Sequence, residues 1–271
     1  MHIHNDNCMD VSILQANLTW AEPDANRRHL ETMIDPLNTD MIVMPEMFST
    51  GFVTNPAGIA EKSGILSDSS LQSSPESLEW MRKMAAEKDA AIAGSVAVEE
   101  GGRFYNRFYF VFPDGQFVCY NKHHLFTYGG EDKTYTAGQE CVVVTFQSCR
   151  ILLQTCYDLR FPVFSRNEWL GDHAKYDMAV YVASWPDSRS EAWKTLLRAR
   201  AIENQCFVVG VNRVGNDPAC SYSGDSAVID PYGKYLAQCT PYLEESKNVN
   251  IDMDELARFR QKFPVLLDAD Q

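Results

Sequence analysis

Short apolar runs separated by polar and turn residues recur along the whole chain. Runs of this length, bounded by Gly, Pro, Asn or Asp, are typical of buried β-strands and are too short to be whole helices. The sequence therefore predicts strands at residues 11–15, 40–44, 91–98, 103–112, 116–122, 142–146, 150–155, 178–183, 207–212, 226–229 and 234–238.

Apolar residues spaced three and four positions apart mark helices between these strands. Residues 23–34 carry Leu30, Met33 and Ile34 at this spacing, and residues 75–88 have the same pattern. Two more helices are expected at residues 162–170 and 189–204. Residues 61–77 are expected to form the longest surface loop.

The order of the elements predicts the fold class. Turns at residues 113–115 and 230–233 close two hairpins, which argues against a purely parallel sheet. Strand-rich halves with helices between them predict sheets covered by helices on their outer faces. We expect an α/β fold, a four-layer α-β-β-α sandwich, with residues 1–271 as a single domain and residues 1–8 as an N-terminal extension.

The net charge of the chain limits the kinds of partner that it can bind. The 271 residues include 24 Lys and Arg against 37 Asp and Glu, a formal net charge of −13. A nucleic-acid or anionic-membrane surface would repel such a chain, whereas one local cation is enough to bind a small anionic substrate. No apolar run reaches the roughly 18 residues of a membrane helix, and residues 1–10 lack a signal-peptide pattern. We expect a cytoplasmic protein.

The eight cysteines are scattered and form no Cys-x-x-Cys pair, so the spacing predicts free thiols and no zinc site. Cys156 has the most informative setting, because the apolar run 150–155 ends abruptly at it and the polar Asp158 and Arg160 follow. A core cysteine would lie inside its strand. A thiol at a strand end is accessible to a substrate, and the backbone N–H groups that follow point at whatever the sulfur attacks.

Two charged residues also stand at the ends of predicted strands. Glu46 follows the run 40–44, where partial burial suits a carboxylate to general base and acid chemistry near neutral pH. Lys122 ends the run 116–122; beside a thiol it would favour the thiolate and stabilise an oxyanion. Each residue, taken alone, is as well explained by a solvated surface position.

Other polar residues near these positions are ambiguous. Glu131, on a glycine-rich stretch, either orients Lys122 or Glu46 or is solvated. His123 and His124 alternate across a strand exit, so they cannot both face one site, and a Cys–His dyad is disfavoured. Arg160, Arg166 and Arg189 are the cations able to hold a substrate carboxylate by a bidentate contact.

Taken together, the chain resembles the nitrilase superfamily of carbon–nitrogen hydrolases over nearly its whole length. The resemblance rests on three blocks in the family's order: Pro-Glu with Glu46, Lys-His-His-Leu-Phe with Lys122, and Cys-Tyr-Asp-Leu-Arg-Phe with Cys156. Within the superfamily the chain looks most similar to bacterial omega-amidases, through the Pro-Glu-Met-Phe-Ser-Thr-Gly-Phe string from Pro45 and through Trp185-Pro186.

The resemblance implies hydrolysis of the terminal amide of short dicarboxylate monoamides, especially 2-oxoglutaramate and 2-oxosuccinamate. It implies the α-β-β-α sandwich, a homodimer or higher homo-oligomer, no metal and no organic cofactor. It also implies Glu131 as a fourth site residue and a thioester mechanism. In that mechanism Glu46 is the base, Cys156 the nucleophile, and Lys122 with the N–H of Tyr157 the oxyanion donors.

For the substrate carboxylate, Arg189 beside Trp185 is the first choice and Arg160 the second. Two alternatives remain open from the sequence. One is another enzyme of the superfamily, such as an aliphatic amidase, an N-carbamoyl hydrolase or a nitrilase. The other is a catalytically silent binding protein, which the complete set of Glu46, Lys122 and Cys156 argues against.

Overall fold

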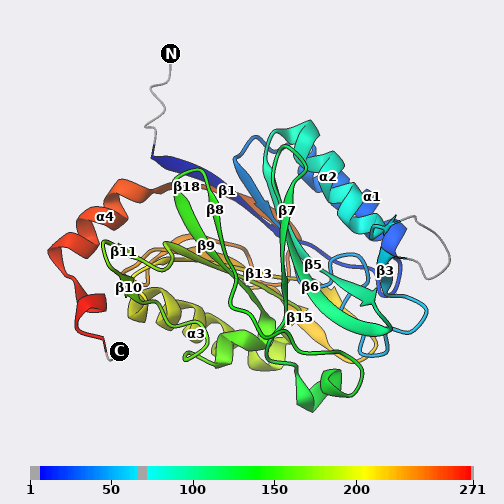
Figure 1. The fold of residues 1–271 in the computed structure, drawn as a ribbon. Helices are drawn as coiled ribbons and strands as arrows, with labels where there is room; N and C mark the ends of the chain where they lie inside the picture. Colours follow the sequence, from blue (N-terminus) through cyan, green and yellow to red (C-terminus); the bar gives the residue numbers. More distant parts are fainter. Residues whose placement is uncertain (1–6, 66–71, 270–271) are drawn as a thin grey trace.

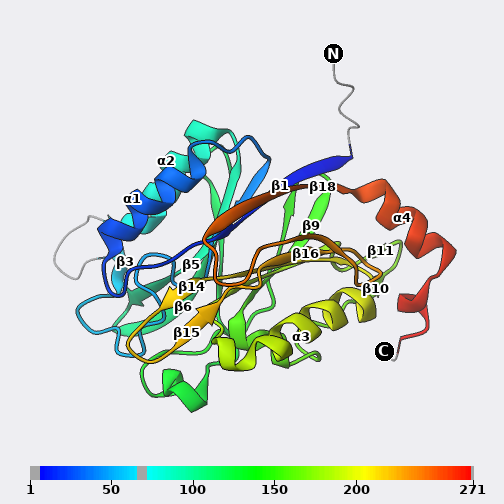
Figure 2. The same ribbon diagram turned by 180° about the vertical axis from the view of Figure 1, so that it is seen from behind.

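The computed structural model describes residues 7–65 and 72–269, and Figures 1 and 2 show its layers from opposite sides. Two β-sheets face each other in the middle of the molecule. Helices α1 (Pro23–Ile34) and α2 (Glu76–Lys88) cover the outer face of one sheet, and α3 (Ser190–Glu203) covers the outer face of the other. The expected four-layer α-β-β-α arrangement is confirmed.

The first sheet has eight strands: β1 (Cys8–Gln15), β2 (Met41–Val43), β3 (Glu61–Ile65), β4 (Gln72–Ser73), β5 (Ala91–Glu100), β6 (Arg103–Val111), β7 (Phe117–Asn121) and β18 (Glu245–Asp252). The path runs β18-β1-β2-β5-β3-β4, and β6 and β7 extend from β5. Strands β1, β2 and β5 are parallel, whereas β5, β6 and β7 form an antiparallel meander. The sheet is therefore mixed, as the hairpin turns predicted.

The second sheet has six strands: β8 (Val143–Phe146), β9 (Cys149–Thr155), β12 (Met178–Ala183), β13 (Phe207–Asn212), β16 (Ala227–Ile229) and β17 (Tyr235–Gln238). Its order is β17-β16-β13-β12-β9-β8. The central strands β9, β12 and β13 are parallel, so their carboxyl ends meet at one edge of the sheet. In α/β sheets this edge is where ligands bind.

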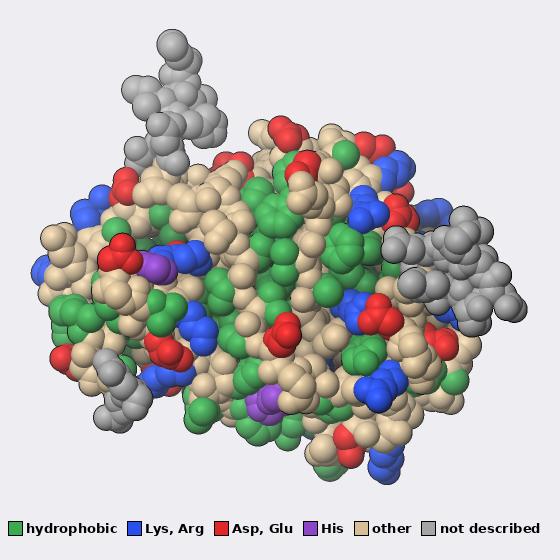
Figure 3. Space-filling model, viewed as in Figure 1, with side chains coloured by type: hydrophobic (Ala, Val, Ile, Leu, Met, Phe, Trp, Pro, Cys, Tyr) green, Lys and Arg blue, Asp and Glu red, His purple; other side chains and the backbone are tan. Residues whose placement is uncertain are grey.

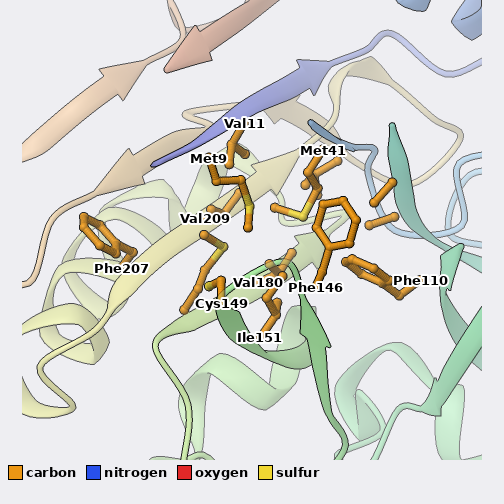
Figure 4. Close-up of a cluster of buried hydrophobic side chains, with 14 of the residues drawn as sticks. Met9, Val11, Met41, Phe110, Phe146, Cys149, Ile151, Val180, Phe207 and Val209 are labelled. Carbon is orange, nitrogen blue, oxygen red and sulfur yellow. The ribbon is translucent and has the colours of Figure 1, made fainter. Parts of the chain in front are cut away.

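The largest hydrophobic cluster lies between the two sheets (Figure 4). Met9, Met41 and Phe110 of the first sheet pack toward Ile151 and Val180 of the second. Each such fully buried side chain contributes roughly 1.5–3 kcal/mol through burial of apolar surface. On the face seen in Figure 1, hydrophobic side chains also reach the surface in a band between the sheets (Figure 3).

The prediction of a helix at residues 162–170 is wrong. A short 3-10 helix (Cys156–Arg160) comes earlier, and turns and the hairpin strands β10 (Trp169–Leu170) and β11 (His173–Ala174) follow it. The amide of Asn167 donates to the backbone oxygens of Tyr176 and Asn204 and accepts from the N–H of Tyr176. These bonds tie the backbone to distant segments and compete with a helix.

Three further expectations need correction. Residues 61–77 are not one loop, because they contain β3 and β4; residues 66–71 of that range lie outside the described residues. Cys8 begins β1, so it does not belong to an N-terminal extension. The predicted elements end with the strand at residues 234–238, but the chain continues into β18, which pairs with β1, and into helix α4 (Met253–Lys262).

Two short strands, β14 (Val214–Asn216) and β15 (Ser221–Ser223), form a separate hairpin after β13. Within the described residues, no helix has the length and apolar character to cross a membrane.

Candidate active site

Glu46 lies in the turn that follows β2. The turn is fixed to the neighbouring strand β5, because the N–H of Met44 donates to the carbonyl of Ala93 (2.8 Å) and the N–H of Met47 donates to the hydroxyl of Ser95 (2.9 Å). Glu46 itself is 0% exposed. Its carboxylate is thus held inside the molecule between the two sheets.

Lys122 follows β7 and is also fully buried. Its backbone N–H donates to the carbonyl of Asn106 (2.9 Å), and its carbonyl accepts from the N–H of Gly138 (2.9 Å). A Cβ at Gly138 would lie 2.1 Å from the carbonyl oxygen of Asn121, so only glycine allows this approach. The ammonium lies 2.9 Å from Glu46 Oε1 and 2.9 Å from Glu131 Oε2.

Glu131 comes from the loop after Lys122, which forms two 3-10 turns at Thr127–Gly129 and Glu131–Lys133. It is 0% exposed, so the solvated alternative is wrong. Besides Lys122, its Oε2 accepts from the backbone N–H of Phe126 (2.6 Å). Glu131 therefore links the ammonium to the backbone of its own loop.

Two further donors reach the carboxylates, and the sequence analysis named neither. Asn106 Nδ2, from the middle of β6, lies 2.7 Å from Glu46 Oε1 and 3.2 Å from Glu131 Oε1. The backbone N–H of Ser184, just beyond β12, donates to Glu46 Oε2 (2.8 Å). An uncharged polar side chain in a strand rich in aromatic residues was the only sequence signal for Asn106.

Cys156 is the first residue of the 3-10 helix that follows β9, and it is 8% exposed. Its φ of +47° lies in the left-handed region, which costs a non-glycine residue of order 1–3 kcal/mol. Asp158 stabilises the turn by accepting from the N–H of Thr155 (3.0 Å) and the N–H of His124 (2.9 Å). Tyr157, as the second helical residue, has a backbone N–H that no intrahelical bond uses.

The charges in the site shift its pKa values. Burial raises the pKa of the Cys156 thiol well above its usual range; the charge of Glu46 and the thiol's hydrogen bond to Glu46 add to this, and Lys122 opposes it. Lys122 thus lowers the pKa of the thiol, as expected, but burial and Glu46 outweigh this effect, so the thiol is neutral at rest. Burial alone would lower the pKa of Lys122, but Glu131 and Glu46 raise it well above its usual value.

The two histidines do not form a Cys–His dyad. His124 Nδ1 contacts Asp158 (2.9 Å) and its ring stacks on Phe161, while His123 Nδ1 contacts the carbonyl of Gly138 (2.7 Å). Both rings pack around the turn that carries Cys156. The contact of His124 with Asp158 helps to hold that turn in place.

Cys156 lines a pocket of about 490 Å³. Seven aromatic side chains line it, and these rings come from both halves of the chain: Trp20, Phe52, Phe126, Tyr128, Tyr157, Trp185 and Tyr222. The pocket also brings together the predicted Arg160, Arg189 and Trp185. Arg166 lines a different hollow near the C-terminus.

The two pocket arginines are held by rings. The guanidinium of Arg160 lies 4.9 Å from the ring centre of Trp185, and that of Arg189 lies 5.5 Å from Phe126. Among the described residues no carboxylate pairs with either one. Asp217, which also lines the pocket, accepts from the hydroxyl of Tyr222 and from two backbone N–H groups of its own loop.

Comparison with known proteins identifies the family. The model of the carbon–nitrogen hydrolase family matches residues 10–261. The chain belongs to the carbon–nitrogen hydrolase family. It is therefore a hydrolase that acts on carbon–nitrogen bonds other than peptide bonds. The predicted resemblance to the nitrilase superfamily is confirmed.

Several characterised or solved relatives cover nearly the whole chain. The omega-amidase YafV of Escherichia coli is 42% identical over 265 residues, which is 97% of this chain and 97% of that protein. A 2-oxoglutaramate amidase of Bacillus subtilis is 34% identical, covering 95% of this chain and 96% of that protein.

The structural relatives agree with this assignment. A CN-hydrolase superfamily protein of Xanthomonas campestris, with an arsenic adduct in its active site, superimposes with a TM-score of 0.91 at 39% identity, covering 100% of this chain and 98% of that one. A Saccharomyces cerevisiae member of branch 10 of the nitrilase superfamily has a TM-score of 0.81 at 22% identity, covering 95% of each chain, and supports the fold alone.

Proposed function

We propose that this carbon–nitrogen hydrolase is an omega-amidase, which hydrolyses the terminal amide of short dicarboxylate monoamides such as 2-oxoglutaramate and 2-oxosuccinamate. The observation that carries the proposal is the pocket itself. It places Cys156, hydrogen-bonded to the buried Glu46, in one cavity with two arginines that pair with no carboxylate within residues 7–65 and 72–269. The relatives named as omega-amidase and 2-oxoglutaramate amidase support this choice of substrate.

In the first half of the reaction Cys156 is the nucleophile and Glu46 the base. The thiol is neutral at rest because its pKa is raised, so its proton moves to Glu46 as the sulfur attacks the amide carbon. The carbonyl oxygen becomes an oxyanion, which the ammonium of Lys122 and the N–H of Tyr157 stabilise. Lys122 keeps its charge in this step because its two carboxylate neighbours raise its pKa.

The tetrahedral intermediate then collapses. Glu46 gives its proton to the departing nitrogen, the carbon–nitrogen bond breaks, and ammonia leaves a thioester on Cys156. Water, deprotonated by Glu46, attacks the same carbon and releases the dicarboxylate, while the thiolate regains its proton from Glu46. Glu131 does not touch the substrate in this scheme; it holds Lys122 in place through two contacts of 2.9 and 3.2 Å.

The distal carboxylate of the substrate is assigned to Arg189, with Arg160 beside it and Trp185 as the packing surface. A guanidinium binds a carboxylate through two parallel hydrogen bonds, and in the described part of the chain no carboxylate competes for these two. Stacking on Phe126 and Trp185 fixes the planes of the two groups.

Replacing Arg189 by alanine is expected to raise KM for 2-oxoglutaramate by roughly 10- to 100-fold, the value of one charge-assisted hydrogen bond. The kcat changes little, because Arg189 does not touch the reacting carbon. Steady-state kinetics measure both constants, and Arg166→Ala, outside the pocket, is the matched control. An unchanged KM would transfer the role to Arg160.

Ammonia release from a panel of substrates tests the proposed function. Turnover of 2-oxoglutaramate and succinamate, with little from glutamine, a simple nitrile or an N-carbamoyl amino acid, is the expected result. Turnover of only the nitrile, the carbamoyl compound or an aliphatic amide would assign another enzyme of the family. No turnover of any compound, with Cys156 no more reactive toward iodoacetamide than the other cysteines, would favour a binding protein.

The location, domain organisation and assembly belong to the same proposal. A nucleophilic free thiol favours a reducing compartment, so we place the protein in the cytoplasm. We assign residues 1–271 to one carbon–nitrogen hydrolase domain. The resemblance to the superfamily supports a homodimer, and two-fold pairing is the commonest assembly of such proteins.

A further inference from the structure

Asn106 is the one uncharged side chain that contacts both carboxylates of the site among the described residues, and no step above uses it. It is 1% exposed and projects from β6, whose backbone carbonyl at the same residue accepts from the N–H of Lys122. The residue therefore fixes Lys122 through its backbone and the carboxylates through its side chain.

The hydrogen bonds of the Asn106 amide are unevenly satisfied. Its single nitrogen carries two hydrogens, and the two acceptors lie 2.7 Å away on Glu46 and 3.2 Å away on Glu131. Its oxygen Oδ1 is buried and has no partner among the described residues. An unsatisfied buried acceptor costs free energy, and such exceptions call for an explanation. Here the amide is oriented so that both hydrogens of Nδ2 point at the two carboxylates, and this orientation leaves Oδ1 without a partner.

The charge balance shows why both hydrogens are needed. Two carboxylates share one ammonium, so the resting cluster of Glu46, Glu131 and Lys122 carries a net charge of −1 away from water. Burial raises the pKa of Glu131, Lys122 opposes this, and the charge of Glu46 raises it further. A neutral donor that spans both carboxylates lowers the cost of keeping them ionised together.

The other titratable groups around Glu46 do not supply this donor. The thiol of Cys156 donates to Glu46 only until its proton is transferred. Tyr135 senses the charges of both carboxylates, but burial raises its pKa well above its usual value, and its hydroxyl donates to the carbonyl of Val53 (2.7 Å). Ser184 donates its backbone N–H to the Glu46 carboxylate and its hydroxyl to the Glu46 carbonyl, and among the described residues it makes no hydrogen bond to Glu131.

We propose that Asn106 is a positioning residue that keeps Glu46 ionised, and directed at the Cys156 thiol, by donating one hydrogen to each of the two carboxylates. The inference rests on the proposed role of Glu46 as the base. Without Asn106, the two carboxylates share a proton more readily, and the population of Glu46 able to accept the thiol proton at neutral pH falls.

The test follows the alkylation of Cys156 by iodoacetamide from about pH 5 to about pH 9, read as the mass of the modified peptide. This range lies below the raised pKa of the thiol, so the pH midpoint of the rate reports the base that accepts the thiol proton. In Asn106→Leu, which keeps the volume and loses both hydrogens, the pH midpoint of the alkylation rate moves upward by roughly one unit. Asn106→Ser keeps one donor and is expected to give a smaller shift. Asn250→Ala is the control, because Asn250 also donates to a carboxylate from a strand but pairs with Asp10, remote from the pocket.

A purely structural role predicts a different result: a uniform loss of reactivity with no shift of the midpoint. An unchanged midpoint in either folded variant therefore overturns the proposal, as does the failure of both variants to fold, judged by thermal unfolding.

Alkylation needs no substrate, so a shifted midpoint without turnover of 2-oxoglutaramate would reject the substrate and keep the inference. Turnover with an unshifted midpoint would reject the inference alone. In the pH profile of kcat, activity lost near neutral pH should recover in alkaline solution.

Discussion

Cys156→Ala is expected to reduce ammonia release from 2-oxoglutaramate to the background rate, a loss on the order of 10⁶-fold. The reason is that in the proposed mechanism the acyl group has no other acceptor, because the neighbouring Glu46, Lys122 and Glu131 are assigned as base, cation and support. Removal of a small, buried sulfur leaves the fold intact, so KD for the substrate, measured by calorimetry, should stay within about tenfold of the wild-type value.

A matched control separates the nucleophile from cysteine content in general. Cys141→Ala removes a half-buried thiol that does not line the pocket and is expected to keep full turnover. If Cys156→Ala retained substantial activity, covalent catalysis at this position would be wrong. If Cys141→Ala lost activity equally, thiol loss would act through the fold.

Lys122→Met is expected to lower kcat by at least about 10²–10³-fold, the typical cost of one oxyanion donor. It should also lower the free energy of unfolding by roughly 3–5 kcal/mol, because Glu46 and Glu131 lose their buried counter-ion. Methionine is unbranched and only one atom shorter than lysine, so the main change is the loss of the charge. Urea unfolding and steady-state kinetics measure the two effects separately.

A double variant distinguishes catalysis from support. Lys122→Met combined with Glu131→Gln removes one of the two stranded carboxylates, so stability should recover in part. Activity should not recover, because the oxyanion donor is still missing. Recovery of both together would show that Lys122 acts only by holding the carboxylates apart.

Glu46, Lys122 and Cys156 were predictable because each follows a short apolar strand, and strand ends meet at one edge of the sandwich. The burial of Glu131 was not predictable, since it depends on the loop after Lys122 turning back onto the ammonium. Asn106 was missed for a similar reason: its partners lie 60 and 25 residues away along the chain. A single polar residue in a strand does not reveal which of the two faces it occupies.

The errors in the fold have equally local causes. Strand β18 reads Glu-Ser-Lys-Asn-Val-Asn-Ile-Asp and lacks an apolar run, because it lies at the edge of its sheet and most of it is exposed or half-buried. Its pairing with β1, 230 or more residues away along the chain, is what makes it a strand. The helix predicted at residues 162–170 does not form, and Asn167 explains why. Its side chain bonds to segments that are distant along the chain, so these bonds exist only in the folded protein.

The covalent step is tested most directly by the partition of the acyl group between water and hydroxylamine. The ω-amide and the ω-methyl ester of 2-oxoglutarate are each hydrolysed in the presence of hydroxylamine, and the ratio of hydroxamate to acid is measured. A thioester on Cys156 is common to both substrates, so the account predicts the same ratio whichever group leaves. A ratio that depends on the leaving group, or acid as the sole product from both substrates, would contradict it.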